Sequence, residues 1–343
     1  MIALPQDVAF IIHKIEKAGF EAFAVGGCIR DSLLSRIPND WDITTSALPE
    51  QVKALFPHTI DTGIKHGTVT VMCHHVGYEV TTYRIDGEYE DGRHPKQVVF
   101  TPSLIEDLKR RDFTINAMAY NDSRGLVDAF EGQQDLQKGV IRAVGEPEKR
   151  FSEDALRIMR AVRFAAQLGY TIEEETEAAM RRLSDTLTKI SAERIQVELV
   201  KLLVSDHPGH MKILYETGIT KVILPEFDRM METEQNNPHH LYSVGMHTIR
   251  AMEEVPADKV LRLTMLFHDM GKPAKKTTDA EGIDHFHGHA ELSAKMAKEI
   301  LQRLKFDNDT IGKVTKLVKN HDRKIIPHAK YVRRALCDLG EEI

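Results

Sequence analysis

The stretch FAVGGCIRDSLLSRIPNDWDITTS, which begins at Phe23, places a short apolar run, two glycines, a helical segment and two aspartates one after another. The apolar run Phe23–Val25 predicts a buried strand. Gly26 and Gly27 let the backbone come close to something bulky and anionic, such as a phosphate. The residues around Asp31 and Leu34 predict a short amphipathic helix. This order predicts a strand, a tight turn and a helix in the N-terminal part of the chain. A lone Gly-Gly is more often an ordinary turn than a phosphate-binding one.

Two aspartates, Asp40 and Asp42, complete this stretch. Residues i and i+2 of a strand point to the same face, so we expect the two carboxylates to lie side by side. Mg²⁺ prefers hard oxygen ligands and keeps contact with substrate phosphates. Two such ions can clamp the attacking and leaving oxygens of a phosphoryl transfer. Alone, two aspartates at this spacing are more often a solvated turn or a helix cap. Their combination with the strand and the two glycines favours a metal-dependent phosphoryl-transfer site.

The longer pattern GGCIRD…NDWDITT resembles the nucleotidyltransferase superfamily with the polymerase-β-like fold. Within it, the chain resembles the bacterial tRNA nucleotidyltransferase and poly(A) polymerase branch, the class II CCA-adding enzymes. The similarity covers residues 20 to about 225 and includes TIDTGIKHGTVTV, YEVTTYR, DLKRRDFTINAMAY, GLVDAFEGQQDLQKGVIRAVGEPEKRF, SEDALRIMRAVRFA and ISAERIQVEL. It implies an α+β fold with three parts. These are a nucleotidyltransferase head with a small mixed sheet (1–138), a helical neck and body for base selection and tRNA binding (139–233), and an all-α HD domain (234–343).

The resemblance also implies roles for particular residues of the head. Asp40 and Asp42 match the catalytic metal-binding pair, Glu79 is the expected third carboxylate, and Asp112 competes with it for that role. Arg111 matches a triphosphate contact, because phosphate oxygens suit the planar guanidinium fork. The full set of residues expected to bind the nucleotide is Gly26, Gly27, Arg30, Arg111, Asp112, Asn116, Asp154, Arg157, Arg160 and Arg163.

Glu153, Asp154 and Arg157 match the EDxxR motif with which this family reads the base. We expect Ser152 to cap a helix that begins there, with Asp154 and Arg157 on one face and Glu153 supporting Arg157 at i, i+4. Spacing alone would also fit an ordinary ion pair within a helix. The resemblance implies instead that the donors of Arg157 and the acceptors of Asp154 match the Watson–Crick edges of cytosine or adenine.

The segment from Asp86 to Pro95, with the sequence DGEYEDGRHP, is polar and contains glycine and proline, which predicts a mobile loop. It resembles the flexible loop of relatives that add the whole CCA sequence, whereas relatives that add only CC have a shorter one. The loop therefore favours CCA addition. The alternative is a plain surface loop.

The C-terminal part is rich in histidine: His247, His268-Asp269, His289 and His321-Asp322 all occur in helical sequence. Neutral imidazole and carboxylate are good ligands for divalent transition metals. The segment LTMLFHDMGKP resembles the HD phosphohydrolase domain, which implies a second metal site with His247, His268, Asp269, His289 and His321 as ligands. The closing aspartate of that family has only Asp338 as a late candidate. We therefore expect an incomplete site that binds metal weakly and shows little hydrolase activity.

The 343 residues carry a net charge of −6, which argues against broad non-specific binding to nucleic acid but not against a local basic groove. Candidate contributors to such a groove are Lys109-Arg110-Arg111, Lys149-Arg150, Arg157, Arg160, Arg163 and Arg181-Arg182. No apolar run reaches the length of a membrane span, and charges interrupt the N-terminal amphipathic pattern, unlike a signal peptide. Three separated cysteines without a CxxC motif indicate reduced thiols and a cytoplasmic location. The oligomeric state stays open.

Together these features predict template-independent addition of CCA to the 3′ end of tRNA, with CTP and ATP as substrates, Mg²⁺ as cofactor and pyrophosphate as leaving group. An A-adding or poly(A)-adding relative would use the same chemistry, and the EDxxR residues alone do not separate the two. An HD phosphohydrolase with a degenerate head is disfavoured by the intact pair Asp40 and Asp42. A non-catalytic RNA-binding protein is disfavoured because these carboxylates would repel RNA without a metal.

Overall fold

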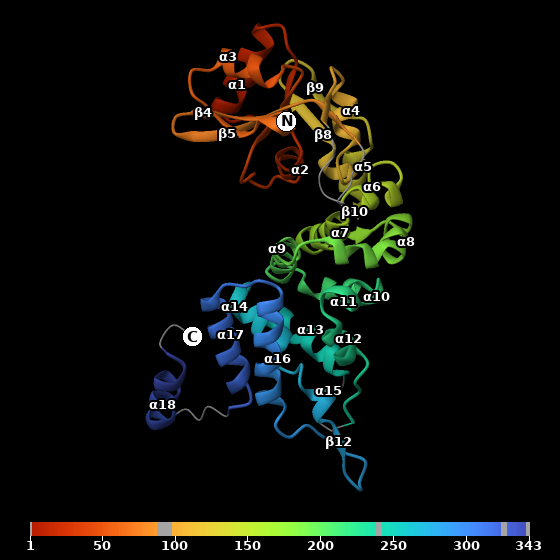
Figure 1. Cartoon of the computed structure of the whole chain (residues 1–343), viewed down its shortest axis with the longest axis vertical. Helices are drawn as coiled ribbons and strands as arrows, with labels where there is room; N and C mark the ends of the chain where they lie inside the picture. Colours follow the sequence, from red (N-terminus) through yellow and green to blue (C-terminus); the bar gives the residue numbers. More distant parts are fainter. Residues whose placement is uncertain (1, 88–97, 237–241, 324–327, 341–343) are drawn as a thin grey trace. The chain divides into compact units, whose positions relative to one another are not determined.

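The computed structural model describes residues 2–87, 98–236, 242–323 and 328–340 (Figure 1). The chain forms two compact units: the first comprises residues 1–157 and 171–179, and the second comprises residues 158–170 and 180–343. Most of the predicted loop lies outside the described residues, because these resume only at Val98. Within the described residues, no helix combines the length and apolar character needed to cross a membrane.

The first unit is built on a seven-stranded sheet with the strand order β3-β4-β5-β2-β1-β8-β9. Its strands are β1 (Ala22–Val25), β2 (Asp42–Thr45), β3 (Thr59–Gly63), β4 (Thr68–Cys73), β5 (Val76–Thr82), β8 (Met118–Asn121) and β9 (Gly125–Asp128). Strands β2 and β5 are parallel, whereas the other neighbours are antiparallel. The predicted mixed sheet and the α+β fold class are therefore confirmed.

Helix α1 (Gln6–Lys17) packs against this sheet and lies beside α3 (Pro49–Leu55) (Figure 1). Its amphipathic sequence explains this, because Val8, Ile11, Ile12 and Ile15 are all buried. Phe23 and Val25, which alternate with alanines along β1, form a core with Leu104 and Leu108 of α4 (Leu104–Lys109). The site-bearing strands β1 and β2 are thus held at the centre of the sheet.

The predicted strand, turn and helix at the first motif are confirmed: α2 (Gly27–Leu33) directly follows β1. The predicted placement of both aspartates in one strand is wrong, because β2 begins only at Asp42 and Asp40 precedes it. The hairpin β6 (Arg84–Asp86) and β7 (Val98–Phe100) flanks the residues that are not described. The 3-10 turns η1 (Ile64–His66) and η2 (Thr114–Asn116) belong to the same unit.

The EDxxR residues lie at a break between two helices rather than in one helix. Helix α6 (Pro147–Glu153) ends at Glu153, and α7 (Leu156–Leu168) begins three residues later. Asp154 has extended backbone between them, with φ −143° and ψ 104°. The predicted helix start at Ser152 is therefore wrong, because Ser152 lies within the last turn of α6 and Asp154 interrupts the helical hydrogen bonds.

Shorter elements complete the first unit. Helix α5 (Gly132–Lys138) leads to β10 (Val140–Ile141), which pairs in parallel with β11 (Thr171–Ile172). Helix α8 (Glu174–Leu183) follows, and the division between the units falls within it.

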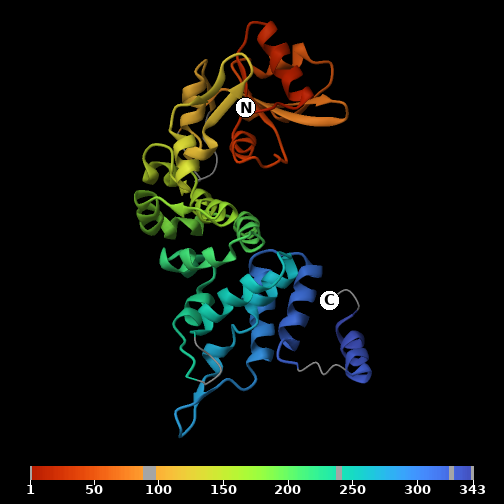
Figure 2. The same cartoon turned by 180° about the vertical axis from the view of Figure 1, so that it is seen from behind.

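The second unit is mostly helical. Its elements after α8 are η3 (Ser184–Lys189), α9 (Ala192–Leu203), η4 (Pro208–His210), α10 (Met211–Glu216), α11 (Ile219–Ile223), α12 (Pro225–Met231), α13 (Val244–Glu254), α14 (Lys259–Phe267), α15 (Lys272–Lys275), β12 (Thr277–Thr278), β13 (Asp284–His285), α16 (His289–Arg303), α17 (Asn308–Asn320) and α18 (Ala329–Leu339). Helices α16 and α17 run side by side, and α14 packs against both (Figures 1 and 2). This packing brings the ends of α14 and α17 and the start of α16 together, which matters for the histidines they carry.

Candidate functional site

Three carboxylates gather where β2 and β5 lie side by side. Ile43 pairs with Val80 in the parallel register, so Asp42 and Glu79 each precede this pair on neighbouring strands. Partial burial raises the pKa of Asp42, and Asp40 adds to the rise, whereas Arg111 opposes it. Burial also raises the pKa of Glu79, followed by repulsion from Asp42 and Asp40. Asp42 and Glu79 thus lie on neighbouring strands, with Asp40 close enough to raise the pKa of both, and a bound divalent cation would relieve this repulsion.

Asp112, the competing candidate, is engaged elsewhere. It is buried, and one carboxylate oxygen accepts from the backbone N–H of Phe113 at 2.9 Å and from the side-chain amide of Asn116 at 3.2 Å. The side-chain oxygen of Asn116 in turn accepts from Nη1 of Arg30 at 2.8 Å. The geometry therefore favours Glu79 as the third carboxylate. Arg30, Asn116 and Asp112 form a separate polar chain in the same unit.

The predicted glycine turn approaches Arg111 closely. Gly26 has φ 86°, a conformation that favours glycine, and a Cβ built there would lie 3.0 Å from Nη1 of Arg111. Because Val25 pairs with Asp42, this turn lies beside the carboxylates. Burial and the nearby Asp42 raise the pKa of Cys28 to about 11, so its thiol stays protonated. Backbone amides, a guanidinium group and a carboxylate thus share one small region.

Asp107 is a functional candidate that the sequence pattern did not single out. It is fully buried, and its carboxylate accepts from the hydroxyl of Thr44 on β2 at 3.1 Å and from Nε and Nη2 of Arg110 at 3.0 and 2.9 Å. Arg111 lies 3.7 Å away. Burial by itself would raise the pKa of Asp107, but Arg110 and Arg111 outweigh it and lower the pKa. Asp107 therefore fixes the arginine pair relative to the strand that carries Asp42.

Glu153 lies between two arginines. Its Oε2 is 2.6 Å from Nη1 of Arg157, and its Oε1 is 2.5 Å from Nη2 of Arg150. The predicted support of Arg157 by Glu153 is thus present, although the helix is interrupted. Asp154 accepts from the backbone N–H of Leu156 at 3.0 Å, which stabilises the start of α7. Arg150, predicted as part of a basic groove, is buried and occupied by this carboxylate.

Arg160 and Arg163 belong to the second unit. The guanidinium of Arg163 is 2.8 Å from Oε2 of the buried Glu198 and lies over the ring of Phe164 at 3.8 Å. Arg160 also contacts this ring, at 5.3 Å. These contacts give both arginines a packing role, and a nucleotide contact from either stays a prediction.

The carboxylate trio leads to a prediction for the metal-free protein. Because the folded-state pKa of Asp42 is raised, its carboxyl group stays protonated to a higher pH in the folded chain than in the unfolded chain. The stabilisation that this proton provides is present below the unfolded pKa and is lost as pH rises through the folded pKa. We expect Asp42→Asn to unfold at a higher temperature than the wild type in EDTA, with a gap that widens from about pH 4 to about pH 7. The single tryptophan, Trp41, offers the fluorescence signal. A gap that narrows with rising pH would contradict this.

The second unit brings together all five residues predicted for the HD site. Oδ2 of Asp269 is 3.2 Å from Nε2 of His268 and 3.6 Å from Nε2 of His247. Its Oδ1 is 3.2 Å from Nε2 of His289 and 3.5 Å from Nε2 of His321. The cluster therefore contains two groups of potential metal ligands, which share Asp269.

The hydrogen bonds of these histidines favour a metal. Nδ1 of His268, His289 and His321 lies 2.7 to 2.8 Å from the backbone carbonyls of Met265, Phe286 and Val318, respectively. A carbonyl only accepts, so each Nδ1 carries the proton, and in a neutral ring Nε2 is left as an acceptor. Several Nε2 lone pairs then face one carboxylate, an arrangement that a cation stabilises. Burial by itself would lower the pKa of His321, but the bond to Asp269 outweighs it and the pKa is raised, so a proton competes with a metal for this Nε2.

Two more charged residues join this cluster. The sequence pattern gave Lys272 no role there, and it named Asp322 beside His321 but not among the expected ligands. Nζ of the buried Lys272 lies 2.8 Å from Oδ2 of Asp269 and 3.0 Å from the side-chain oxygen of Gln235. Asp322 lies 3.2 Å from Nε2 of His289 and 3.3 Å from Nε2 of His321. Asp322 thus supplies a second carboxylate without any need for Asp338, whose side chain lies outside the described part. The sequence signals available for these two residues were the Gly-Lys-Pro motif that contains Lys272 and the His-Asp pair at 321–322.

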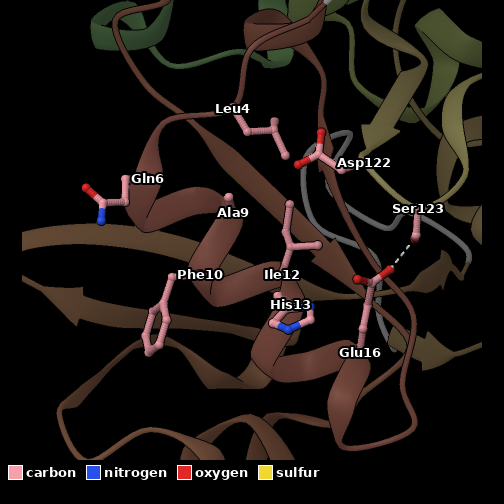
Figure 3. A pocket seen from close by; sticks show the side chains of 9 residues that line it. All are labelled: Leu4, Gln6, Ala9, Phe10, Ile12, His13, Glu16, Asp122 and Ser123. Carbon is pink, nitrogen blue, oxygen red and sulfur yellow. Dashed lines mark hydrogen bonds between the residues drawn. The ribbon is translucent and has the colours of Figure 1, made fainter.

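A separate pocket of about 550 Å³ lies against α1 and is lined by Leu4, Gln6, Ala9, Phe10, Ile12, His13, Glu16, Asp122 and Ser123 (Figure 3). None of the predicted site residues lines it. Its carboxylate Glu16 accepts from Ser123 at 2.6 Å and from Asn121 at 3.0 Å, so this group holds α1 against the turn after β8. The pocket is a structural feature of the first unit.

Comparison with known proteins finds three family matches along the chain. Residues 22–142 match the poly A polymerase head domain, residues 169–231 match the family described as "Probable RNA and SrmB- binding site of polymerase A", and residues 239–337 match the HD domain. The chain is 55% identical over 204 residues to a CCA-adding enzyme of Leuconostoc mesenteroides, covering 59% of this chain and 51% of the relative. It is 55% identical over 221 residues to that of Lactiplantibacillus plantarum, covering 64% and 53%. The chain spans about half the length of these curated relatives.

Solved structures extend the match. The structure of the Bacillus stearothermophilus CCA-adding enzyme in complex with CTP has a TM-score of 0.73 and 33% identity, over 97% of this chain and 74% of that one. A Thermotoga maritima CCA-adding enzyme, at 21% identity and a TM-score of 0.62, shares the fold over 98% of this chain and 73% of its own. The carboxylates beside the glycine turn, the arginine that Glu153 holds, the family matches and the matching fold agree on one conclusion: the chain belongs to the CCA-adding enzyme family.

Proposed function

We propose that this chain adds CCA to the 3′ end of tRNA without a nucleic-acid template, using CTP and ATP. The observation that carries this proposal is the link between two functional centres of the first unit. Arg157, the predicted base reader, donates to the backbone carbonyl of Arg110 at 3.0 Å, directly before Arg111. Arg111 lies beside the carboxylate trio. Base reading and phosphate chemistry are thus connected through one short segment.

Each residue has a definable task in the proposed reaction. The 3′-hydroxyl of the tRNA attacks the α-phosphorus of the nucleotide, and pyrophosphate leaves. Arg111 would hold the triphosphate with its guanidinium fork, and the amides at Gly26 and Gly27 allow close approach of the phosphates. Asn116 and Arg30 lie in the same unit as candidates for contacts with the sugar and phosphates. Asp154 and Arg157 would present acceptors and donors to the edge of the base.

The carboxylates Asp40, Asp42 and Glu79 fit a hard divalent cation, because they offer only oxygen ligands and repel one another. Mg²⁺ bound there would stabilise charge that develops on the attacking and leaving oxygens. A head of this family implies a divalent metal, and Mg²⁺ is the proposed identity.

One assay tests the proposal. The 343-residue chain is incubated with tRNA that ends at the discriminator base, together with CTP, ATP or both, and the 3′ ends are sequenced. We expect CC with CTP alone and CCA with both nucleotides. Runs of A would indicate the poly(A)-adding alternative, and addition of a single A would indicate an A-adding relative. The absence of any addition in Mg²⁺ would refute the proposal.

Replacing Arg157 with alanine should damage nucleotide choice more than phosphate chemistry. A good base-specific contact is worth roughly 1–3 kcal/mol, so discrimination against UTP and GTP should fall about ten- to a hundredfold. The measurement is kcat/KM for each of the four nucleotides on the same tRNA. Equal loss for all four, with unchanged selectivity, would show that Arg157 is structural.

Full CCA addition rather than CC addition rests on the predicted loop from Asp86 to Pro95. Most of this loop lies outside the described residues, so its role stays a proposal based on the resemblance. A similar solved structure supports the nucleotide substrates, because the Bacillus stearothermophilus CCA-adding enzyme is in complex with CTP.

The histidine cluster supports a second candidate function, a metal-dependent phosphohydrolase. The sequence predicts a weak site because it offers no obvious closing aspartate, yet Asp322 places a carboxylate 3.2 Å from His289. We therefore propose that the cluster binds a divalent transition metal. Hydrolysis of 2′,3′-cyclic nucleotides that vanishes in His268→Ala would establish the activity, whereas metal binding without hydrolysis would leave a structural metal site.

A further inference from the structure

We propose that Arg150 is a positioning residue for nucleotide selection: it occupies one oxygen of Glu153 and so keeps Arg157 bound through the other oxygen only. This inference rests on the proposed nucleotide addition and deepens it. Arg150 was expected only to add positive charge to a groove. The structure instead places its guanidinium in the interior, with a side-chain exposure of 10%.

The two arginines divide Glu153 between them. Arg150 approaches Oε1 at 2.5 Å, and Arg157 approaches Oε2 at 2.6 Å. All three side chains are largely buried, with exposures of 10%, 11% and 17% for Arg150, Arg157 and Glu153. At this burial a carboxylate that lost a partner would be costly to leave unpaired. Glu153 therefore keeps two partners, one on each oxygen.

This division decides which donors of Arg157 remain. Its Nη1 donates to Glu153 and to the backbone carbonyl of Arg150, and its Nη2 donates to the backbone carbonyl of Arg110. A guanidinium has five N–H donors, so one on Nε and one on Nη2 have no partner among the described residues. These two are the donors left to meet the edge of a base. If Arg157 paired with both oxygens of Glu153, at least one of these two free donors would be engaged by the carboxylate.

Arg150 also fixes where the pair sits. Its Nη1 donates to the backbone carbonyl of Lys109 at 3.2 Å, and Arg157 donates to the next carbonyl, that of Arg110. Both arginines are thus attached to consecutive peptides directly before Arg111. The spacing between the base reader and the triphosphate arginine is set by these two contacts and by Glu153.

The consequence of losing Arg150 follows from carboxylate geometry. Without a donor on Oε1, Glu153 is free to rotate and accept Arg157 through both oxygens, the fork geometry that arginine and carboxylate favour. Arg157 would remain paired with Glu153, and the chain would stay folded. The remaining N–H donors of Arg157, however, would point away from the base. The defect should therefore appear in selectivity and should depend on Arg157.

The test is a double-mutant cycle of Arg150→Gln with Arg157→Ala in the full 343-residue chain, with selectivity measured as the ratio of kcat/KM for CTP to that for UTP. We expect Arg150→Gln to lower this ratio about tenfold, since a base-specific contact is worth roughly that much. In the Arg157→Ala background the same change should alter the ratio less than about twofold, because Arg150 acts through Arg157.

Arg142→Gln is the matched control. Arg142 also joins carboxylates and a carbonyl: Asp135 at 2.9 Å, Glu131 at 3.1 Å and the backbone of Phe130 at 3.3 Å. Within the described part of the chain, Arg142 makes no bond to Glu153, so this variant should lose stability but keep the wild-type ratio. An equal loss of selectivity in Arg142→Gln would reduce the role of Arg150 to general stability and overturn the inference.

Folding is checked by the Trp41 fluorescence transition. If Arg150→Gln does not fold, Arg150→Lys decides, because lysine still reaches a carboxylate but lacks the fork that also holds the Lys109 carbonyl. We expect a roughly threefold lower ratio that disappears in the Arg157→Ala background. Unchanged selectivity, or additive effects in the cycle, would overturn the inference. A wild-type chain that adds no nucleotide would instead refute the proposed function itself.

Discussion

Replacing Asp42 with asparagine should lower nucleotide addition on the order of a thousandfold or more while leaving tRNA binding nearly unchanged. Asp42 is central to the trio, since after burial its charge is the largest cause of the raised pKa of Glu79. An amide keeps the shape of the side chain but removes the negative charge that holds a divalent cation. Cation stabilisation of transition-state charge is worth several kcal/mol, and about 4 kcal/mol corresponds to the expected loss. Single-turnover addition of CTP to tRNA measures it.

Asp61→Asn provides the control for this experiment. Asp61 is on β3 of the same sheet, half exposed, and paired with Lys53 at 3.0 Å on the surface. The same carboxylate-to-amide change there should leave addition within about twofold, because exposed ion pairs contribute little. Turnover of Asp42→Asn near the wild-type rate in Mg²⁺ would reject the assignment of Asp42 as a metal ligand.

Local patterns predicted the centre of the head well. The strand before Gly26 and the helix after it are each encoded within a few residues, where period and turn chemistry are informative. The next strand was predicted to include Asp40, but it begins only at Asp42. Glu79 is also confirmed as a neighbour of Asp42 in space, although its role stays a proposal. That prediction needed the parallel register of β2 and β5, which the family resemblance supplied and the residues alone did not.

The break at Asp154 shows where local patterns are ambiguous. Ser152, Glu153 and Asp154 read as a helix start because serine and acidic residues favour the first turn. The same three residues would equally suit the end of one helix, followed by a second helix that Asp154 caps. The structure adopts the second solution, in which Asp154 accepts from Leu156 and Glu153 is shared by two arginines. Tertiary contacts at residues 109 and 110 decide between the two.

Residues whose partners lie far away in the sequence could not be predicted from spacing. Asp107 bonds Thr44 across 63 positions, so nothing in its neighbourhood indicated that it is buried. Asp322 follows a predicted histidine, yet its approach to His289 depends on how α16 packs against α17. In both cases helix and strand packing, rather than local sequence, brings the charges together.

Asp269→Asn should weaken divalent-metal binding by the second unit about a hundredfold or more. One oxygen of Asp269 faces His247 and His268, and the other faces His289 and His321, so both groups of potential ligands lose their common carboxylate. Loss of a supporting residue around a metal already costs ~10–100-fold in affinity, and loss of a shared ligand should exceed that. Co²⁺ added to the metal-free protein, followed by its visible absorption and by calorimetry, measures the change.

Asp279→Asn is the matched control, because Asp279 also pairs with a histidine of the second unit, His285 at 2.7 Å, but belongs to neither group of potential ligands. It should bind Co²⁺ like the wild type. Asp269→Asn should also leave nucleotide addition within about twofold, since the carboxylate trio belongs to the first unit. Because the change leaves Lys272 buried without its carboxylate, a lower unfolding temperature is expected as well. Unaltered Co²⁺ affinity in a folded Asp269→Asn protein would show that the cluster is a buried charge network and not a metal site.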